Sequence, residues 1–351
     1  MSEKREYTLR FVQEGSGRTA SVSISQKALG VPTILELKGD TSETLLRQVL
    51  PGVRVDWGDG TTTTTDESVS STRNVVRHTY SGSVPTPRIV KIYGMRERKR
   101  IFLETPFDYK NLIGVRQLGE MSDIAGLFSF CKELKSVPET LFEHNKGAKS
   151  LNCCFNGCSA LTSIPASLFA GMSQVDDLSA CFQDCKSLRT LPSGLFSDCR
   201  ADSFNNCFQA CTSLQSLPNL FSRQTSVKTF IGTFIGCTGL TTLPDGLFDA
   251  CSMVTSFSGC FKGCTSLTAI PTGLFDKQRN ATDFTRCFLN CTSLSGETPY
   301  ATVNGTKVKL WQRDPAKNGY AKVEQYQEGF RYCKGLSDYS QIPTGWASQY
   351  D

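Results

Sequence analysis

Histidine is scarce in this sequence, and its scarcity limits the chemistry available. Among 351 residues there are only two histidines, His78 and His144. Structural zinc is held by four cysteine or histidine ligands, and most catalytic zinc sites use histidine. Mixed Cys–His zinc sites are therefore nearly excluded, and no nucleophile motif accompanies His78 that would make it a catalytic base. We expect neither a metal site nor a bound cofactor.

The motifs of the common enzyme classes are missing as well. The sequence has no phosphate-binding loop, no His-Glu-x-x-His pair, no Gly-x-Ser-x-Gly turn and no paired-carboxylate pattern. A glycosidase could carry its two acids without such a signature. The repeats described below leave little of the chain for a catalytic cleft, so we predict a protein that is not an enzyme.

Long apolar runs are also absent. No stretch approaches the ~18 apolar residues of a membrane-spanning helix, so we expect no transmembrane segment. Residues 1–6 include basic side chains, but no apolar run follows them, and they do not form a secretory signal. An export signal removed from this chain, another route out of the cell, and a protein that never leaves the cell remain alternatives.

Charge of one sign is not strongly in excess, since the net charge is +5. The densest basic run, residues 96–100, lacks interleaved aromatic residues, and no nucleic-acid-binding motif accompanies it. We interpret it as a solvated strand end or turn, with a phosphate-binding patch as the alternative, and expect no nucleic-acid partner. The length suits two or three domains.

What the sequence does contain is an internal repeat. Each complete copy has a leading Phe, a Cys three residues later, a Leu three residues after that, then an aliphatic residue and Pro, and finally a Leu-Phe pair. The copy that begins at Phe288 breaks off after Leu294. The leading residues are Phe128, Phe155, Phe182, Phe208, Phe234, Phe261 and Phe288, spaced by 27, 27, 26, 26, 27 and 27 residues. A period this constant predicts a solenoid, in which stacked coils place Leu on Leu and Phe on Phe.

Within one coil, the segment from the Leu to the Pro predicts a short β-strand, which the proline ends. The later part of the coil has an apolar spacing of three and four, as in Val254, Phe257, Phe261 and Cys264. This spacing fits one or two helical turns. We expect an α/β solenoid with short strands and short helical turns, beginning near Asn111 with a capping coil.

Most of the sixteen cysteines fall on two repeat positions. The first holds Cys131, Cys158, Cys185, Cys211, Cys237, Cys264, Cys291 and Cys333, and the second holds Cys154, Cys181, Cys207, Cys260 and Cys287. One coil has Thr233 at the second position, and a site that accepts threonine does not need a disulfide. We interpret the cysteines as a buried, reduced ladder. Scattered disulfides that include Cys153, Cys199 and Cys251, or zinc held by thiolates of adjacent coils, are the alternatives.

Residues 1–105 do not repeat, and alternating segments at 7–12, 34–37 and 88–93 predict strands. The segment Trp57-Gly-Asp-Gly-Thr61 predicts a tight hairpin turn, with the tryptophan filling the core of a β-sandwich. We interpret Asp56 and Asp59 as turn formers. Calcium is the alternative, but one carboxylate pair lacks the six to eight oxygens that calcium takes.

The repeat is interrupted from Gly296. Residues 302–311 predict a hairpin with an Asn-Gly turn, and a last unit runs from Phe330 to Trp346. We expect the hairpin and the tail to cap the open end of the solenoid, with a binding loop as the alternative for Trp311, Tyr320 and Tyr326. Three domains result, at 1–105, 106–295 and 296–351.

The Cys-Phe-x-x-Cys-x-x-Leu-x-x-Ile-Pro units resemble the BspA-like leucine-rich-repeat family of bacterial surface proteins, over residues 111–295 and the last unit. The Trp57–Thr61 turn, followed by His78-Thr-Tyr80, resembles the polycystic-kidney-disease-type domain, an Ig-like all-β sandwich. These resemblances imply display at the bacterial cell surface and binding of a host or microbial partner, a protein or a glycan. They imply no catalysis. The coils are a few residues longer than the commonest repeat of the family.

Two surfaces could bind a partner. The residues after each strand Leu line one face, but most are Ser or Thr, which we interpret as hydrogen-bonding to each other and stabilising the sheet. The turns after each Leu-Phe pair vary more, and variable loops on a rigid frame are common recognition sites. Candidate binding residues on these surfaces and in the C-terminal hairpin are Lys135, Arg189, Gln215, Arg223, Lys277, Arg279 and Trp311.

A phage or contractile-tail component, such as a receptor-binding tail protein, is the alternative function. Phage particles leave the cell by lysis, so a tail protein needs no export signal, and the absence of such a signal from this sequence favours that alternative. In this case the protein would be located in a virion or tail particle instead of on a bacterial surface.

Overall fold

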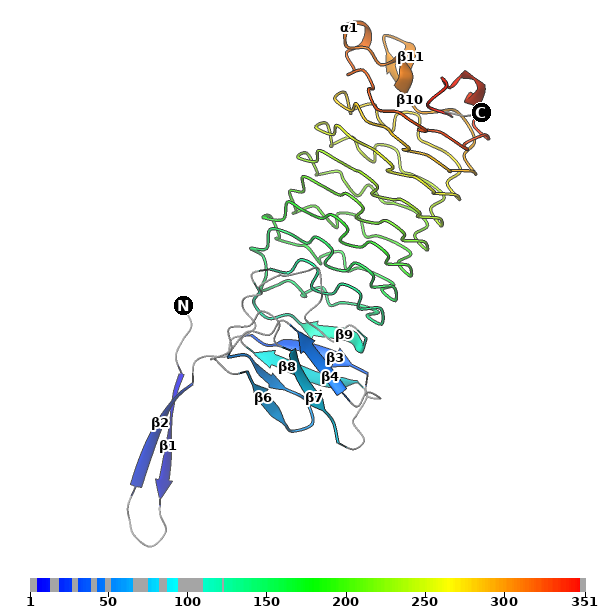
Figure 1. The fold of residues 1–351 in the computed structure, drawn as a ribbon. Coiled ribbons are helices and arrows are strands. Elements are labelled where there is room, and N and C mark those ends of the chain that lie inside the picture. Colours follow the sequence, from blue (N-terminus) through cyan, green and yellow to red (C-terminus); the bar gives the residue numbers. More distant parts are fainter. Residues whose placement is uncertain are drawn as a thin grey trace.

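The chain forms a β-rich N-terminal part, a long stack of coils and a C-terminal cap (Figure 1). The computed structural model describes residues 5–12, 19–26, 31–38, 43–47, 52–65, 75–81, 87–93, 110–121 and 123–347. The basic run at 96–100 lies outside the described residues. No helix within these ranges is long and apolar enough to cross a membrane.

The N-terminal part consists of antiparallel strands, including those expected at 7–12, 34–37 and 88–93. An open five-stranded sheet has the order β6 (Thr62–Thr64), β5 (Arg54–Asp56), β8 (Arg88–Tyr93), β3 (Thr33–Leu37) and β9 (Leu112–Gln117). Separate pairs are β4 (Glu43–Arg47) with β7 (Val75–Thr79), and β1 (Arg5–Val12) with β2 (Thr19–Gln26). Buried and half-buried residues alternate along β3 and β8, as expected for strands that bury one face.

The turn that follows β5 connects this sheet to β7. Trp57 is fully buried, and its ring stacks on His78 of β7 with the ring centroids 4.8 Å apart. Asp59 accepts a hydrogen bond from the Thr61 amide at 2.9 Å, and its other carboxylate oxygen lies 2.7 Å from Nε2 of His78. Gly58 has φ +79, and a Cβ there would lie 2.2 Å from the carbonyl oxygen of Ile89. The turn-forming role expected for Asp59 is confirmed.

Strand β9 joins the N-terminal sheet to the stack. It pairs antiparallel with β3, and the amide of Lys135 in the first coil donates to the carbonyl of Ile113 in β9. The amide of Gly119 donates to Oγ1 of Thr33 at 3.0 Å, and Nδ2 of Asn145 donates to the Gly119 carbonyl at 3.2 Å. The segment expected as a capping coil is therefore an edge strand of the sheet on which the stack begins.

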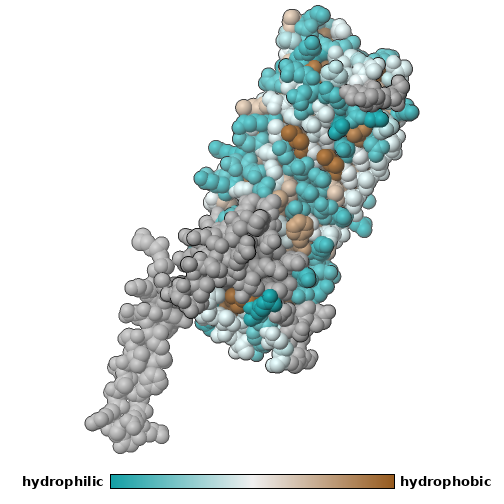
Figure 2. Space-filling view, viewed as in Figure 1, coloured by the Kyte–Doolittle hydropathy of each residue, from teal (hydrophilic) through white to brown (hydrophobic). Residues whose placement is uncertain are grey.

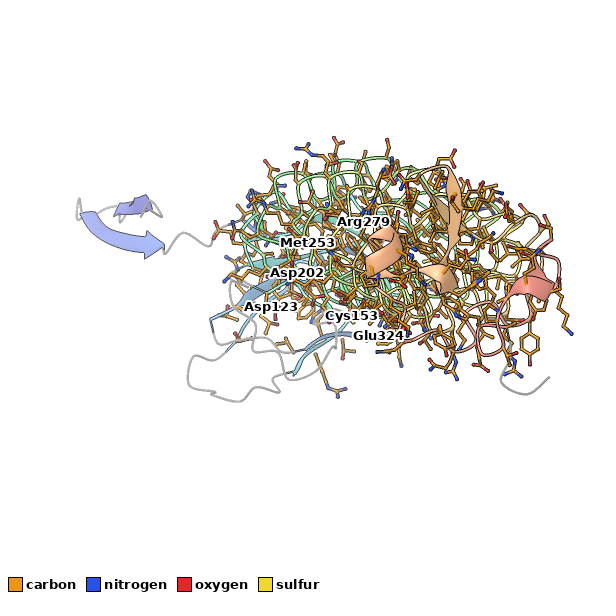
Figure 3. All side chains as sticks on the ribbon, turned by 90° about the horizontal axis from the view of Figure 1, so that it is seen from above. Asp123, Cys153, Asp202, Met253, Arg279 and Glu324 are labelled. Atoms are coloured by element: carbon orange, nitrogen blue, oxygen red, sulfur yellow. The ribbon has the colours of Figure 1, made fainter. Side chains whose placement is uncertain are left out.

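The coils stack with the repeated phenylalanines in register. Neighbouring rings lie with their centroids 5.4 Å apart for Phe155 and Phe182, and 5.6 Å apart for both Phe182–Phe208 and Phe208–Phe234. The stacking also crosses the interruption, because Phe288 and Phe330 are 5.4 Å apart. The repeated phenylalanines are buried, and Figure 3 draws them with the other side chains of the stack as seen from above. The expected alignment of Phe on Phe is confirmed.

Two expectations about the single coil are wrong. The segment from Leu to Pro forms no strand, and the isolated bridges that lie there among the described residues are Ser216↔Thr242 and, at the interruption, Gly296↔Leu336. The helical turns are hydrogen-bonded turns without α-helix. The α-helix that the structure does describe is the four-residue α1 (Pro315–Asn318), outside the regular coils. A row of parallel bridges instead connects Ser150, Asp177, Ser203, Thr229, Ser256, Asp283 and Gln325.

Left-handed residues explain why the coil is neither helix nor strand. In the coil of Phe155, the residues two before and two after it have positive φ, +55 at Cys153 and +74 at Gly157. The amides of Cys153, Phe155 and Gly157 donate to the next coil, while those of Cys154 and Asn156 donate three residues back. A helix needs successive right-handed residues. Left-handed residues at every fourth position prevent it and direct alternate amides to the next coil.

The C-terminal segment covers the last regular coil. Strands β10 (Tyr300–Val303) and β11 (Thr306–Lys309) form the expected hairpin, with 3₁₀ turns at Leu310–Gln312 and Tyr339–Gln341 following it. The ring of Trp346 stacks on Phe330 at 5.9 Å, and it also contacts Trp311 at 6.1 Å. The phenylalanine ladder therefore ends on a buried tryptophan.

Candidate binding surface

The cysteines lie in the interior of the stack, and all sixteen are buried thiols that are not joined in disulfides. At the first repeat position each thiol from Cys158 onward donates to the carbonyl of the leading Phe one coil earlier. The Sγ···O distance is 3.1 Å for Cys211 with Phe182 and 3.0 Å for Cys333 with Phe288. Burial raises the pKa of the Cys237 thiol to about 12. These thiols are protonated hydrogen-bond donors at neutral pH rather than nucleophilic thiolates.

The three cysteines outside the two main rows are not in disulfides either. Cys199 and Cys251 lie three residues after the second Phe of their coils, at a position that Gln224 and Gln278 occupy in other coils. Nε2 of Gln224 and of Gln278 each donates to a backbone carbonyl of the preceding coil at 2.6 Å. This third row therefore also holds neighbouring coils together, and Cys153 is one of the left-handed residues described above.

The residues that follow the Leu six positions after each leading Phe form a surface row, and Lys135, Arg189 and Gln215 are exposed there. Its hydroxyls donate to backbone carbonyls of the preceding coil, for example from Thr268 to Thr241 at 3.1 Å. The side-chain-to-side-chain bonds that the sequence suggested are not found along this row in the described coils. The row still stabilises the stack, because each such bond connects two coils.

The variable turns follow the second Phe of each coil. Lys277 is exposed, and its Nζ lies 3.6 Å from a carboxylate oxygen of Asp276. Arg279 lies over the ring of Tyr320, 4.7 Å from its centroid. Arg279 therefore contacts the cap as well as solvent, and Trp311 is half-buried between Phe330 and Trp346. The structure does not bring the seven candidate residues together at one site.

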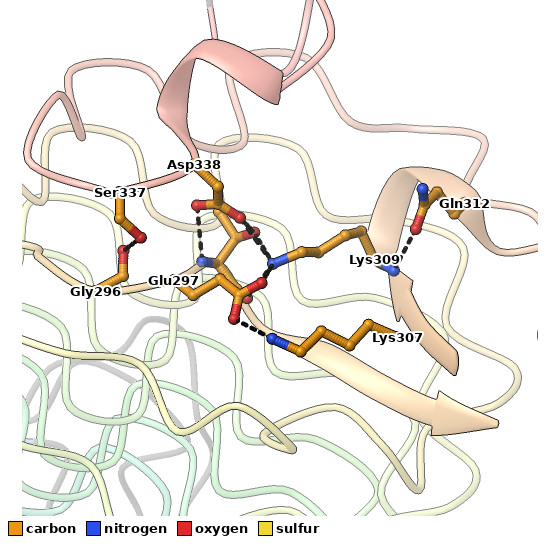
Figure 4. A network of polar contacts seen from close by, with 8 residues as sticks. Gly296, Glu297, Lys307, Lys309, Gln312, Ser337 and Asp338 are labelled. Atoms are coloured by element: carbon orange, nitrogen blue, oxygen red, sulfur yellow. Dashed lines mark hydrogen bonds and ion pairs between the residues drawn. The ribbon is translucent and has the colours of Figure 1, made fainter. Parts of the chain in front are cut away.

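A buried polar network fixes the cap (Figure 4). Nζ of Lys309 lies 2.7 Å from a carboxylate oxygen of Asp338 and donates to Oγ1 of Thr298 at 2.9 Å. Burial alone would raise the pKa of Asp338, but the hydrogen bonds from Lys309 and Thr298 lower it overall. Arg313 donates to two carbonyls of the last regular coil, and burial lowers its pKa to about 10. No short-range pattern predicts these contacts, because the partners lie far apart along the chain.

The visible surface of the stack is mostly hydrophilic, with separate hydrophobic residues (Figure 2). The exposed large hydrophobic residues of the described chain are Phe130, Ile231, Met253 and Tyr332. Among the described residues, no three His, Cys, Asp or Glu side chains are placed to hold a metal ion together.

A polar cavity of about 520 Å³ opens on the variable turns of three consecutive coils. It is lined by Gly171, Ser173, Ser197, Asp198, Cys199, Arg200, Arg223, Gln224, Thr225 and Ser226. A second cavity of about 250 Å³ lies at the cap, between Trp311, Lys322 and Tyr326. Arg223 and Trp311 are among the binding residues predicted from the sequence, whereas Arg200 is not.

Comparison with known proteins shows a distant similarity to a solved structure. No protein-family model and no curated protein matches the sequence. The structure of the Toll–Spatzle complex of Drosophila matches with 17% sequence identity and a TM-score of 0.23, covering 53% of this chain and 27% of that chain. Toll is a leucine-rich-repeat protein. The match spans about a quarter of that chain.

Proposed function

We propose that this protein is a non-catalytic binding protein that recognises a protein or glycan through the variable turns of a leucine-rich-repeat solenoid. In this proposal the repeats are BspA-like, and the N-terminal strands form an Ig-like sandwich of the polycystic-kidney-disease type that acts as a spacer. The protein is displayed on a bacterial cell surface, where its partner is a host or microbial molecule.

The proposal is supported by a difference between the interior of the stack, where the same side chains repeat, and the turns, where the residues vary. The interior rows repeat the same side chains and use their polar atoms for bonds between coils. The turns after the second Phe differ in length and charge, from Ser-Asp-Cys-Arg at 197–200 to Asp-Lys-Gln-Arg-Asn at 276–280. Variable loops on a rigid frame are the usual place for recognition. The raised thiol pKa values also leave the cysteines unsuited to nucleophilic chemistry.

Arrays of glycans and of surface proteins, probed with the full chain, test this function. Partners found in this way are then measured against single substitutions in three turns, Arg223→Glu, Met253→Glu and Lys277→Glu. We expect at least one to weaken binding, whereas Lys132→Glu, an exposed charge reversal outside these turns, leaves it unchanged. An absence of partners, or equal binding by all four variants, contradicts the proposal.

A further inference from the structure

The larger cavity exists because one turn of the stack is shorter than its neighbours. Four residues, 197–200, separate Phe196 from the buried Ala201, whereas five separate Phe169 from Val175 and Phe221 from Val227. All four residues of the short turn line the cavity, with residues of the longer turns on both sides of them. In a regular stack, a turn that is one residue shorter lies deeper than the turns on either side. The same shortening gives the 26-residue spacing from Phe182 to Phe208 in the sequence.

Two arginines from adjacent coils line this recess. Arg200 comes from the short turn and Arg223 from the next turn, and both are exposed. Neither forms an ion pair among the described residues. The nearby Lys228, by contrast, is paired with Asp202 at 2.6 Å. An arginine whose planar guanidinium has no carboxylate partner is suited to bind an anionic oxygen pair with two parallel hydrogen bonds.

The other lining groups favour a hydroxyl-rich ligand. Ser173, Ser197, Thr225 and Ser226 supply hydroxyls that can donate or accept. The carboxylate of Asp198 accepts one hydrogen bond from the Gly171 amide at 2.7 Å, and its second oxygen can accept from a ligand hydroxyl. The volume falls within the range of ~300–1,000 Å³ typical of small-ligand sites.

We propose that this cavity binds a saccharide unit carrying a single negative charge, a carboxylate or a sulfate ester. The two arginines and Asp198 give the lining residues a net charge of +1, which one such group neutralises. A phosphate monoester carries about −1.5 to −2 at neutral pH, and the Asp198 carboxylate repels the excess. The inference rests on the proposed function, because it makes the turn surface the recognition surface and names its ligand class.

Calorimetric titration of the full chain tests this assignment. The probes are trigalacturonate, its methyl ester, galactose 6-sulfate and a phosphoserine peptide. We expect trigalacturonate or the sulfate to bind, more weakly as salt is raised, and the neutral ester not to bind. Binding of only one of the two probes shows whether the site takes a carboxylate or a sulfate ester. Either result supports the proposal if binding depends on the two arginines.

Matched variants establish that dependence. Arg200→Gln and Arg223→Gln each weaken binding by roughly tenfold to 100-fold, as expected when one charge-assisted contact is lost. Lys132→Gln, at an exposed position outside the variable turns, leaves it unchanged. Inserting one glycine between Cys199 and Arg200 restores the five-residue turn length and abolishes binding without lowering the melting temperature. The same insertion between Ser252 and Met253, in a turn that already has five residues, preserves it.

Several results overturn the inference. These are no binding of either acid, equal binding of the methyl ester, equal binding by the arginine variants, or arginine-dependent binding of the phosphopeptide alone. One of these results can occur while Met253→Glu or Lys277→Glu still weakens binding to a partner found on the arrays. The saccharide site is then refuted, but the proposed function is not. If the arrays also give no partner, both proposals are refuted.

Discussion

The hydroxyl of Thr233 donates to the carbonyl oxygen of Phe204, one coil earlier, at 3.0 Å. Thr233 occupies the repeat position that holds cysteine in most other coils, so the position accepts a hydroxyl in place of a thiol. Both side chains are small, and both can donate a hydrogen bond in a fully buried place. The relationship indicates that the cysteines of this stack act as compact donors rather than as cross-links.

Substitution of Thr233 separates the hydrogen bond from the shape of the side chain. Thr233→Val keeps the shape but removes the hydrogen bond between the two coils, and the Phe204 carbonyl keeps the Cys207 amide as a donor. We expect this loss to cost about 0.5–1.5 kcal/mol. Thr233→Cys restores the commoner residue and costs less than about 0.5 kcal/mol. Urea unfolding of the three proteins measures both changes, and equal midpoints for valine and cysteine contradict the assigned role.

Alkaline pH is expected to destabilise the fold through the thiols. Burial raises the pKa of Cys237 and of Cys333 from 9.0 to about 12. A pKa raised in the folded state contributes stability that is complete below the unfolded value and is lost as pH rises toward the folded value. The urea midpoint should therefore fall progressively between pH 9 and pH 12, while the ultraviolet absorbance of thiolate appears only on unfolding. Thiolate absorbance from the folded protein within this window contradicts the account.

Substitution of Ala180 tests whether the coil backbone is left-handed at this position. Its φ is +53, a conformation that costs a residue with a Cβ roughly 1–2 kcal/mol. The greater freedom of glycine in the unfolded chain offsets about 0.4–1 kcal/mol of this. We expect Ala180→Gly to stabilise by up to about 1 kcal/mol. Ala170, which is not among the residues of positive φ, provides the control, because Ala170→Gly should destabilise. Destabilisation of similar size at both positions contradicts the assignment.

Substitutions in the buried pair Lys309–Asp338 test how much this contact stabilises the cap. Asp338→Asn removes one of the two carboxylates that pair with the Lys309 ammonium, which keeps Glu297 at 2.9 Å. We expect this change to cost about 1–2 kcal/mol. Lys309→Met combined with Asp338→Asn should cost less than the sum of the single changes, because the contact between the two side chains can be lost only once. Because the pKa of Asp338 is lowered from 3.8, its contribution is present above that pH and is lost on further acidification. Additive single and double variants contradict this coupling.

The register of the stack could be predicted from the sequence, but the local backbone could not. Phe182, Phe208 and Phe234 recur at nearly constant spacing, and a constant spacing of large apolar residues permits few arrangements. An apolar spacing of three and four fits a helix as well as stacked turns. The deciding feature, positive φ at Cys153 and Ala180, is not visible in residues that usually avoid it.

The site was predictable only in part, for a similar reason. Arg223 was identified because its turn varies between coils. Arg200 was missed, although the 26-residue spacing that follows Phe182 was the available signal for a recessed turn. The Lys309–Asp338 contact depends on how the hairpin folds back on the last coil. No short-range pattern encodes that contact, because the two residues lie 29 positions apart.

The central claim is that the coils stack in register through their phenylalanines and leave the turns free for recognition. Proton–proton Overhauser contacts in a chain with only its phenylalanine rings protonated test it most directly. The account predicts contacts between the rings of Phe182 and Phe208 and between those of Phe208 and Phe234, each pair with centroids 5.6 Å apart. Contacts of Phe208 with neither neighbour, in a folded sample, would contradict it.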